Sequence, residues 1–250
     1  MAIRVLGCSG GLDSAGGSTC IRVGENILID AGTGLSTLSI DEMRKVEHIF
    51  LTHSHMDHIA ALPMFLSNMF EKVDHQVKVY AQAHTIEKLT THIFNNEIWP
   101  DFRELPTAQN PIVKFIETVP GDSFQLRSLM PFGTGAGMLT LFPVDHTVPT
   151  VGVSVRDDSS HFVFTSDTTA GDLLDRELNK LGEIDVLMIE CSFTDDKHEL
   201  AVQTKHMTPQ MVDNTLSNLS RAPKEVWISH LKPSCAAELR PQLSKKYKVL

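Results

Sequence analysis

Thr52-His53-Ser54-His55-Met56-Asp57-His58 is the segment that says most about this chain, because it places three imidazoles and a carboxylate within six residues. It directly follows an apolar run, residues 46–51, which predicts a buried strand that ends where the polar cluster begins. In open α/β sheets, ligands bind in the crevice outside the carboxyl ends of the strands. Imidazole binds zinc, iron, copper or nickel, and carboxylate adds a harder oxygen ligand. Four such side chains exceed the needs of one open catalytic metal, so the segment predicts two ions close together.

Three further apolar runs each lead into a residue type that binds metal. Residues 139–142 run into Asp145-His146, residues 162–165 into Ser166-Asp167, and residues 226–228 into Ser229-His230. A metal site assembled by a fold draws its ligands from several strand ends, so we expect these residues to meet the first cluster. Taken singly, each is equally well explained as an ordinary capping or surface residue.

Composition limits the classes of function. The chain has 250 residues, 42% of them hydrophobic, which is enough for a sizeable core in one large domain or two small ones. A net charge of −9 argues against a general surface for nucleic acid, because such surfaces are basic. A small phosphate substrate remains compatible with that charge, since two divalent ions would make the pocket locally positive.

The cysteines and the N-terminal sequence indicate the cellular compartment to expect. Cys8, Cys20, Cys191 and Cys235 form no C-x-x-C pair, and their spacing predicts free thiols in a reducing environment. Residues 1–11 resemble a first strand more than a signal peptide, and no apolar run is long enough to span a bilayer. We therefore expect a cytoplasmic protein that does not contact a membrane.

The order of predicted elements indicates a layered α/β sandwich with helices outside, because strands lead at both ends of the chain and helices lie between them. Strands are predicted at residues 2–6, 19–23, 26–29, 46–51, 77–80, 112–119, 123–126, 139–144, 151–156, 161–165, 186–189 and 226–229. Helices are predicted at residues 59–72, 85–98, 172–181 and 208–218. We expect one hydrolase domain over residues 1–250, with residues 85–117 as a substrate-cap excursion.

The pattern His-x-His-x-Asp-His, followed by a spaced His, Asp and His, resembles the metallo-β-lactamase fold superfamily of binuclear metallohydrolases over nearly the whole chain. The resemblance implies a four-layer αββα sandwich with the site at one edge. It implies a first ion held by His53, His55 and His146, a second held by Asp57, His58 and His230, and a bridging Asp167. The lactamase branch lacks a bridging aspartate of this kind, so antibiotic hydrolysis is not expected.

Finer motifs resemble the phosphodiesterase side of that superfamily. Residues 146–152 and 165–168, Glu190-Cys191-Ser192-Phe193 and His206-Met207-Thr208 are similar to ribonuclease Z and to class II cyclic-nucleotide phosphodiesterases. Residues 92–102 and 229–233 resemble the class II enzymes. Ribonuclease Z carries a long basic arm that grips transfer RNA, and this acidic chain has no Lys/Arg-rich insertion. The resemblance therefore favours a small cyclic nucleotide as substrate.

The resemblance also implies roles in catalysis. A hydroxide bridging two divalent ions, zinc first and manganese or iron as alternatives, would attack a 3′,5′-cyclic nucleotide such as cyclic AMP and give the 5′-monophosphate. Asp57 would help to orient that hydroxide. His206 is the expected general acid, and Glu190 would orient its imidazole. The expected substrate contacts are Asn96, Trp99 and Phe102, although the two aromatic residues are equally well explained as core residues.

Several alternatives stay open from the sequence. One is an endonuclease that processes transfer RNA 3′ ends, and another is a metallohydrolase of a different ester, thioester or lactam. A third is a metal-binding regulatory protein without turnover, which the intact ligand set disfavours. The sequence does not rank cyclic AMP against cyclic GMP, and a homodimer is compatible with it.

Overall fold

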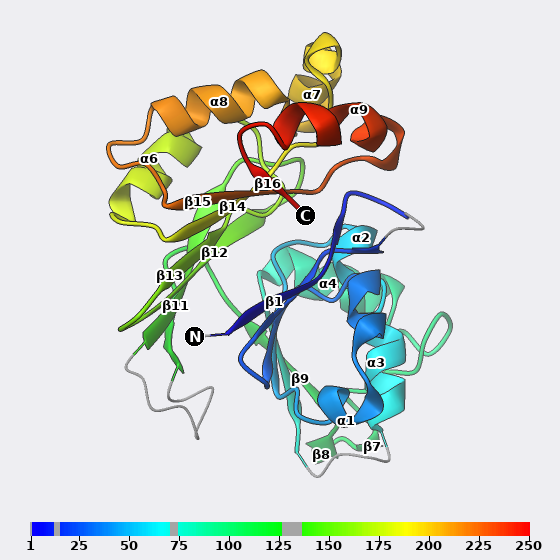
Figure 1. The fold of residues 1–250 in the computed structure, drawn as a ribbon. Coiled ribbons are helices and arrows are strands. Elements are labelled where there is room, and N and C mark those ends of the chain that lie inside the picture. The colour runs from blue at the N-terminus through cyan, green and yellow to red at the C-terminus, as the bar shows by residue number, and fades with distance from the viewer. Residues whose placement is uncertain (1, 13–15, 71–74, 127–136) are drawn as a thin grey trace.

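Two seven-stranded sheets stand face to face, and helices cover the outer side of each (Figure 1). The structure is a computed structural model that describes residues 2–12, 16–70, 75–126 and 137–250. Both sheets are mixed, with antiparallel strands on one side and parallel strands on the other. The predicted αββα arrangement is thus confirmed.

The first sheet comes from the N-terminal half of the chain and has the order β2-β1-β3-β4-β5-β6-β9. Strands β1, β3 and β4 pair antiparallel, whereas β4, β5, β6 and β9 run parallel. The strands are β1 (Ile3–Ser9), β2 (Gly17–Ser18), β3 (Cys20–Val23), β4 (Ile27–Ile29), β5 (His48–Phe50), β6 (Val77–Ala81) and β9 (Val113–Glu117). On the outer face or beside it lie η1 (Thr33–Thr37), α1 (Ile40–Met43), α2 (Met56–Ile59), α3 (Leu62–Met69), α4 (Ala83–His92) and a small hairpin, β7 (Pro106–Thr107) with β8 (Asn110–Pro111).

The second sheet comes from the C-terminal half and has the order β10-β11-β12-β13-β14-β15-β16. Strands β10 to β13 pair antiparallel, and β13 to β16 run parallel. The strands are β10 (Ser123–Gln125), β11 (Gly137–Val144), β12 (Thr150–Asp157), β13 (His161–Phe164), β14 (Val186–Glu190), β15 (Glu225–Ser229) and β16 (Lys248–Val249). Its helices are α6 (Asp172–Lys180), η2 (Asp195–Lys197), α7 (His198–Thr204), α8 (Pro209–Ser217) and α9 (Pro233–Leu243).

A layer of apolar side chains fills the space between the sheets. Alternate residues of β12, Val151, Val153 and Val155, are buried there, as the period-2 geometry of a strand requires. From the first sheet, the rings of Phe50 and Tyr80 stack at 4.3 Å and face the same layer. Two further clusters, one under each helical layer, complete the core.

Parallel strands bring the predicted ligand loops to one edge. Strands β4 and β5 end side by side in the first sheet, and β13, β14 and β15 end side by side in the second. Strand β11 is separated from β13 by one antiparallel strand, so it runs in the same direction and ends at the same edge. The carboxyl ends of six strands therefore surround one place.

Some predicted elements differ from the structure. The helix predicted at residues 85–98 ends at His92, because Phe94 pairs with Trp99 in a β-bridge and the chain reverses at Asn96, which has a φ of 62°. The predicted helix 59–72 is divided into α2 and α3, and its residues 71 and 72 lie outside the described residues. Helix α9, which contains Pro241, was not predicted. No helix in the described ranges has both the length and the apolar character needed to cross a membrane.

Candidate metal centre

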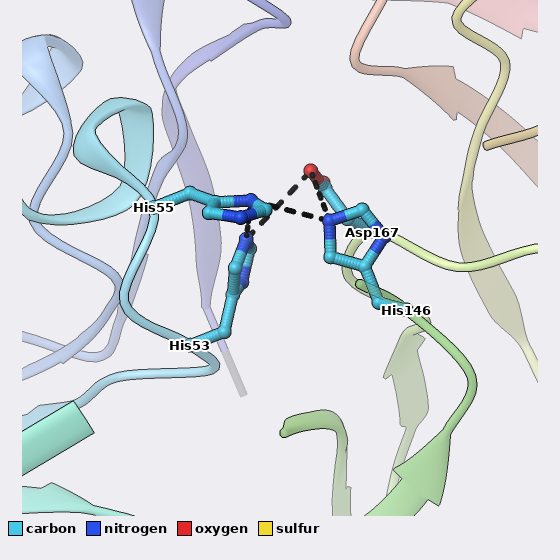
Figure 2. Close-up of side chains that lie close together, drawn as sticks. All are labelled: His53, His55, His146 and Asp167. Atoms are coloured by element: carbon cyan, nitrogen blue, oxygen red, sulfur yellow. Dashed lines mark hydrogen bonds and ion pairs between the residues drawn. The ribbon is translucent and has the colours of Figure 1, made fainter. Parts of the chain in front are cut away.

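The seven predicted ligand residues converge at the common edge of the two sheets. The loop after β5 provides His53 and His55, and α2, which follows it, provides Asp57 and His58; the loops after β11, β13 and β15 provide His146, Asp167 and His230. Two groups of these residues, each with ligand-type atoms within 4.8 Å of one another, share Asp167. Figure 2 shows the first group, His53, His55, His146 and Asp167, pointing toward a common point. The second group is Asp57, His58, Asp167 and His230.

Hydrogen bonds determine which ring nitrogens of the first group carry protons. The hydroxyl of Thr52 donates its hydrogen bond to the carboxylate of Asp30. Its oxygen therefore accepts a hydrogen bond from the N–H at Nδ1 of His53, with Oγ1 and Nδ1 3.0 Å apart. Nδ1 of His146 donates to the carbonyl of Lys205, also at 3.0 Å. The remaining Nε2 atoms of His53 and His146 are therefore acceptors, and they lie 3.0 and 3.2 Å from Nδ1 of His55. Nitrogen atoms from three rings thus converge, two of them with lone pairs directed at the third, and such a set of imidazole nitrogens fits a metal cation.

The second group contains two buried acceptors that face each other. Nδ1 of His58 donates to Asp30 at 2.7 Å, so Nε2 is the atom with the free lone pair. That Nε2 lies 3.3 Å from Oδ1 of Asp167, and neither atom has a hydrogen-bond partner among the residues that the structure describes. Two unpaired buried acceptors cost free energy unless a cation lies between them. The residues of this group therefore fit a metal ion.

The electrostatics of the site agree with this fit. Burial and the neighbouring His146 lower the pKa of His55 to about 4, so its ring is neutral at pH 7, the form that binds metal. Burial acts to lower the pKa of His58, but the carboxylates of Asp167 and Asp30 outweigh it and raise that pKa well above its usual range. The pocket around His58 thus favours positive charge. His53, His58 and Asp167 are almost completely buried, whereas the side chain of Asp57 is 23% exposed and opens the site to solvent.

Strained backbone and close packing hold these loops in place. Asp30, Ser166 and His230 have φ values of 60°, 59° and 59°, in the left-handed region that costs non-glycine residues free energy. Such strain concentrates at functional sites, where the surrounding structure enforces it. Gly32 lies so close to the loop that a Cβ atom there would be 2.2 Å from the carbonyl oxygen of Asp57. A Cβ atom on Gly10 would be 2.7 Å from the carbonyl oxygen of His230.

A third histidine–carboxylate pair lies beside the two groups. Nδ1 of His206 is 2.7 Å from Oε1 of Glu190, which is fully buried at the end of β14. The ring of His206 stacks on His230 with centroids 5.2 Å apart and lies 5.0 Å from the ring of His146. Burial lowers the pKa of His206, but the negative charge of Glu190 outweighs burial and raises it. This pair could hold a proton next to the metal centre.

The three residues that were predicted to contact substrate take part in core packing and in a turn. Phe102 is buried under the helices of the first sheet, and Trp99 donates to the hydroxyl of Ser67 on α3. The side-chain oxygen of Asn96 accepts from the backbone of Asp101 and closes a turn. The assignments of these residues as substrate contacts, and of residues 85–117 as a cap, stay predictions.

Four residues that hold the imidazoles had not been predicted in that role. Asp30, Thr52, Ser192 and the backbone carbonyl of Lys205 each bond the Nδ1 atom of one imidazole. A signal for Asp30 existed, because it directly follows the apolar strand Ile27–Ile29, and Asp167 likewise follows shortly after an apolar strand. Ser192 belongs to the motif Glu190–Phe193, but that motif did not indicate a bond to an imidazole, and a backbone carbonyl such as that of Lys205 is common to every sequence.

The fold and the site together define a class of protein, the metallohydrolases of the metallo-β-lactamase fold, whose α/β sandwich carries buried His/Asp clusters that could hold metal ions. The chain belongs to the β-lactamase superfamily: the family model described as "Beta-lactamase superfamily domain" matches residues 25–250. A solved structure, the metallo-beta-lactamase fold protein YhfI from Bacillus subtilis, is 19% identical, covers 99% of this chain and 94% of its own, and superposes with a TM-score of 0.73.

Two curated relatives are similar in sequence. A probable 3′,5′-cyclic-nucleotide phosphodiesterase of Yersinia pestis is 26% identical over 219 residues, which is 76% of this chain and 58% of that protein. A ribonuclease Z of Azobacteroides pseudotrichonymphae is 30% identical over 158 residues, which is 60% of this chain and 50% of that protein. The matched region thus spans 58% of the length of the first relative and 50% of that of the second.

Proposed function

We propose that this protein is a binuclear metal-dependent phosphodiesterase that hydrolyses a 3′,5′-cyclic nucleotide of the cyclic AMP type to the 5′-monophosphate. The observation that carries the proposal is the pair of His/Asp groups that share Asp167, with the His206–Glu190 pair beside them. The similarity to the Yersinia pestis phosphodiesterase supports the class of substrate.

In this proposal the two groups each hold one divalent ion. His53, His55 and His146 would hold the first ion and Asp57, His58 and His230 the second, and Asp167, which belongs to both groups, would serve both. When bound, two such ions make water a nucleophile at neutral pH and neutralise charge on the phosphoryl oxygens. Zinc is the metal we expect because five of the seven ligands are imidazoles, with manganese or iron as alternatives.

The residues of the chain supply the remaining chemistry. Nδ1 of His206 is committed to Glu190, so Nε2 is the nitrogen that carries a proton to the departing 3′ oxygen. Glu190 also accepts from the backbone N–H groups of Thr168 and Met207, and these bonds fix the direction of its carboxylate. Asp57, partly exposed at the mouth and 3.1 Å from His230, lies where it can orient the attacking water.

The test is a product assay on protein freed of metal and then reconstituted with zinc or manganese. We expect conversion of cyclic AMP to 5′-AMP, and hydrolysis of bis-p-nitrophenyl phosphate as a general diester. His198→Ala, at an exposed histidine on α7, is the matched control for His206→Ala and should keep full activity. Protein that binds two ions yet hydrolyses no cyclic nucleotide would overturn the proposal.

A second candidate is processing of transfer RNA 3′ ends, favoured by the 30% identity to a ribonuclease Z. The net charge of −9 disfavours it, because binding to the phosphate backbone depends on Lys and Arg contacts. A transfer RNA precursor belongs in the same substrate panel. Cleavage of that precursor with no turnover of cyclic nucleotides would select this candidate.

A further inference from the structure

The hydroxyl of Ser192 lies between the Glu190 carboxylate and a ring of the second group. Its Oγ is 2.7 Å from Oε2 of Glu190 and 3.0 Å from Nδ1 of His230. All three residues are buried: Ser192 and Glu190 are inaccessible, and His230 is 2% exposed. Glu190 therefore connects directly to His206 and, through one hydroxyl, to His230.

The direction of each proton in this chain follows from the donors available. Glu190 receives four hydrogen bonds, two on each oxygen, so its acceptor sites are filled by Thr168, His206, Ser192 and Met207. Glu190 thus lacks a free lone pair for a metal, although it lies near His206 and His230 in a third group of ligand-type residues.

Ser192 has only one hydroxyl proton to give. Two acceptors lie in range, Oε2 of Glu190 at 2.7 Å and the carbonyl oxygen of His230 at 3.1 Å. The carboxylate is the nearer and, as a charged acceptor, forms the stronger bond. Toward Nδ1 of His230 the serine oxygen can then only accept, so the proton of the neutral ring lies on Nδ1.

We propose that Ser192 is a positioning residue that fixes the tautomer of His230 and so keeps its Nε2 lone pair available to a metal ion. This inference rests on the proposed role of His230 as a metal ligand. Nε2 of His230 lies 3.1 Å from a carboxylate oxygen of Asp57 and 3.1 Å from one of Asp167. With the proton held on Nδ1, three acceptors meet at this point and require a cation. Without Ser192, a proton on Nε2 satisfies either carboxylate and competes with the metal.

Each of the other rings that present Nε2 has its own outer partner. His58 donates directly to the Asp30 carboxylate, and His146 donates to a backbone carbonyl. Neither of those partners can be deleted without changing a charge or the main chain. His53 has the Thr52 hydroxyl as its partner, but that hydroxyl also donates to Asp30, so its removal would disturb the partner of His58 as well. His230 depends on the hydroxyl of Ser192, which one substitution removes with the loss of a single oxygen atom. Ser192→Ala therefore tests the tautomer of His230 without removing a charge or changing the main chain.

The experiment measures zinc affinity of the full chain by competition with a chromophoric chelator, independently of activity. We expect Ser192→Ala to bind one ion as the wild type does and the other about 10- to 100-fold more weakly, the usual effect of removing an outer partner. Ser192→Thr keeps the hydroxyl and should restore the affinity. Ser229→Ala is the matched control, because that buried hydroxyl is next to His230 in sequence but donates to the carbonyl of Ile189. We expect wild-type affinity there.

The outcomes separate the inference from the proposed function. Wild-type protein that binds none of zinc, manganese and iron would refute the proposed function. Two ions bound with unchanged affinity by Ser192→Ala would refute the inference alone. Should Ser192→Ala fail to fold, the imidazole nitrogen spectrum of wild-type His230 decides the matter by NMR: a proton on Nδ1 supports the inference, and a proton on Nε2 overturns it.

Discussion

Replacement of Asp30 by Asn should weaken metal binding at the second group with little change to the fold. The carboxylate of Asp30 is completely buried; Oδ1 accepts from the backbone N–H of Thr52 at 2.8 Å, and Oδ2 accepts from Nδ1 of His58 at 2.7 Å. Asn matches the shape of Asp and tolerates the left-handed backbone at this position, where φ is 60°. The substitution therefore tests the hydrogen bonds and not the backbone.

The magnitude follows from the number of acceptors. The amide of Asn has one oxygen, and if that oxygen keeps the Thr52 N–H, its NH₂ group faces Nδ1 of His58. His58 must then accept at Nδ1 and place its proton on Nε2, which removes the lone pair facing Asp167. Metal binding at Nε2 requires that proton to return to Nδ1, where it would face the NH₂ group of the substituted side chain without an acceptor. Leaving these buried donors unpaired costs about 1–3 kcal/mol. That cost corresponds to about 5- to 150-fold weaker binding of one ion.

The assay is zinc titration of wild type, Asp30→Asn and Asp41→Asn with a competing chelator, with circular dichroism to check folding. Asp41 is the matched control, since its side chain is 85% exposed and pairs only with Arg44. We expect the control to bind like wild type and Asp30→Asn to lose affinity for one ion. Equal affinity for both ions in a folded Asp30→Asn protein would refute the reasoning.

The remaining predictions concern catalysis and the shared ligand. Asp167→Ala should lose at least one ion, as elemental analysis after dialysis will show; two retained ions would contradict the bridging role. His206→Ala should keep both ions and lose about 10²- to 10⁴-fold in turnover of cyclic AMP. Loss of metal instead would refute the assignment of His206 as the general acid. Burial lowers the pKa of His206, but Glu190 raises it above its usual 6.5, so turnover should fall as pH rises through a value above 6.5. Glu190→Gln should move this fall in turnover to lower pH. A fall at unchanged pH would mean that a group other than His206 causes it.

Local patterns predicted the parts of the site that depend on strand ends. The apolar run before His53 and the runs before Asp167 and His230 predicted buried strands, and the structure places β5, β13 and β15 there. Parallel pairing then brings their ends together, a consequence of fold class that a layered α/β prediction already contains. The sequence therefore predicted that the seven residues converge, but it did not predict their detailed geometry.

The unpredicted parts depend on contacts between distant segments. Asp30 and His58 meet because β4 pairs with β5, and no local pattern in either segment indicates that contact. The end of α4 at His92 depends on the pairing of Phe94 with Trp99, which overrides the helical spacing of the sequence. Tertiary contacts of this kind determine proton positions and element ends.

The most direct test of the account is anomalous diffraction at the zinc edge from crystals of the zinc-reconstituted protein. The account predicts two peaks for each chain, one among His53, His55 and His146 and one among Asp57, His58 and His230, with Asp167 between them. A single peak, or peaks away from these side chains, would contradict it.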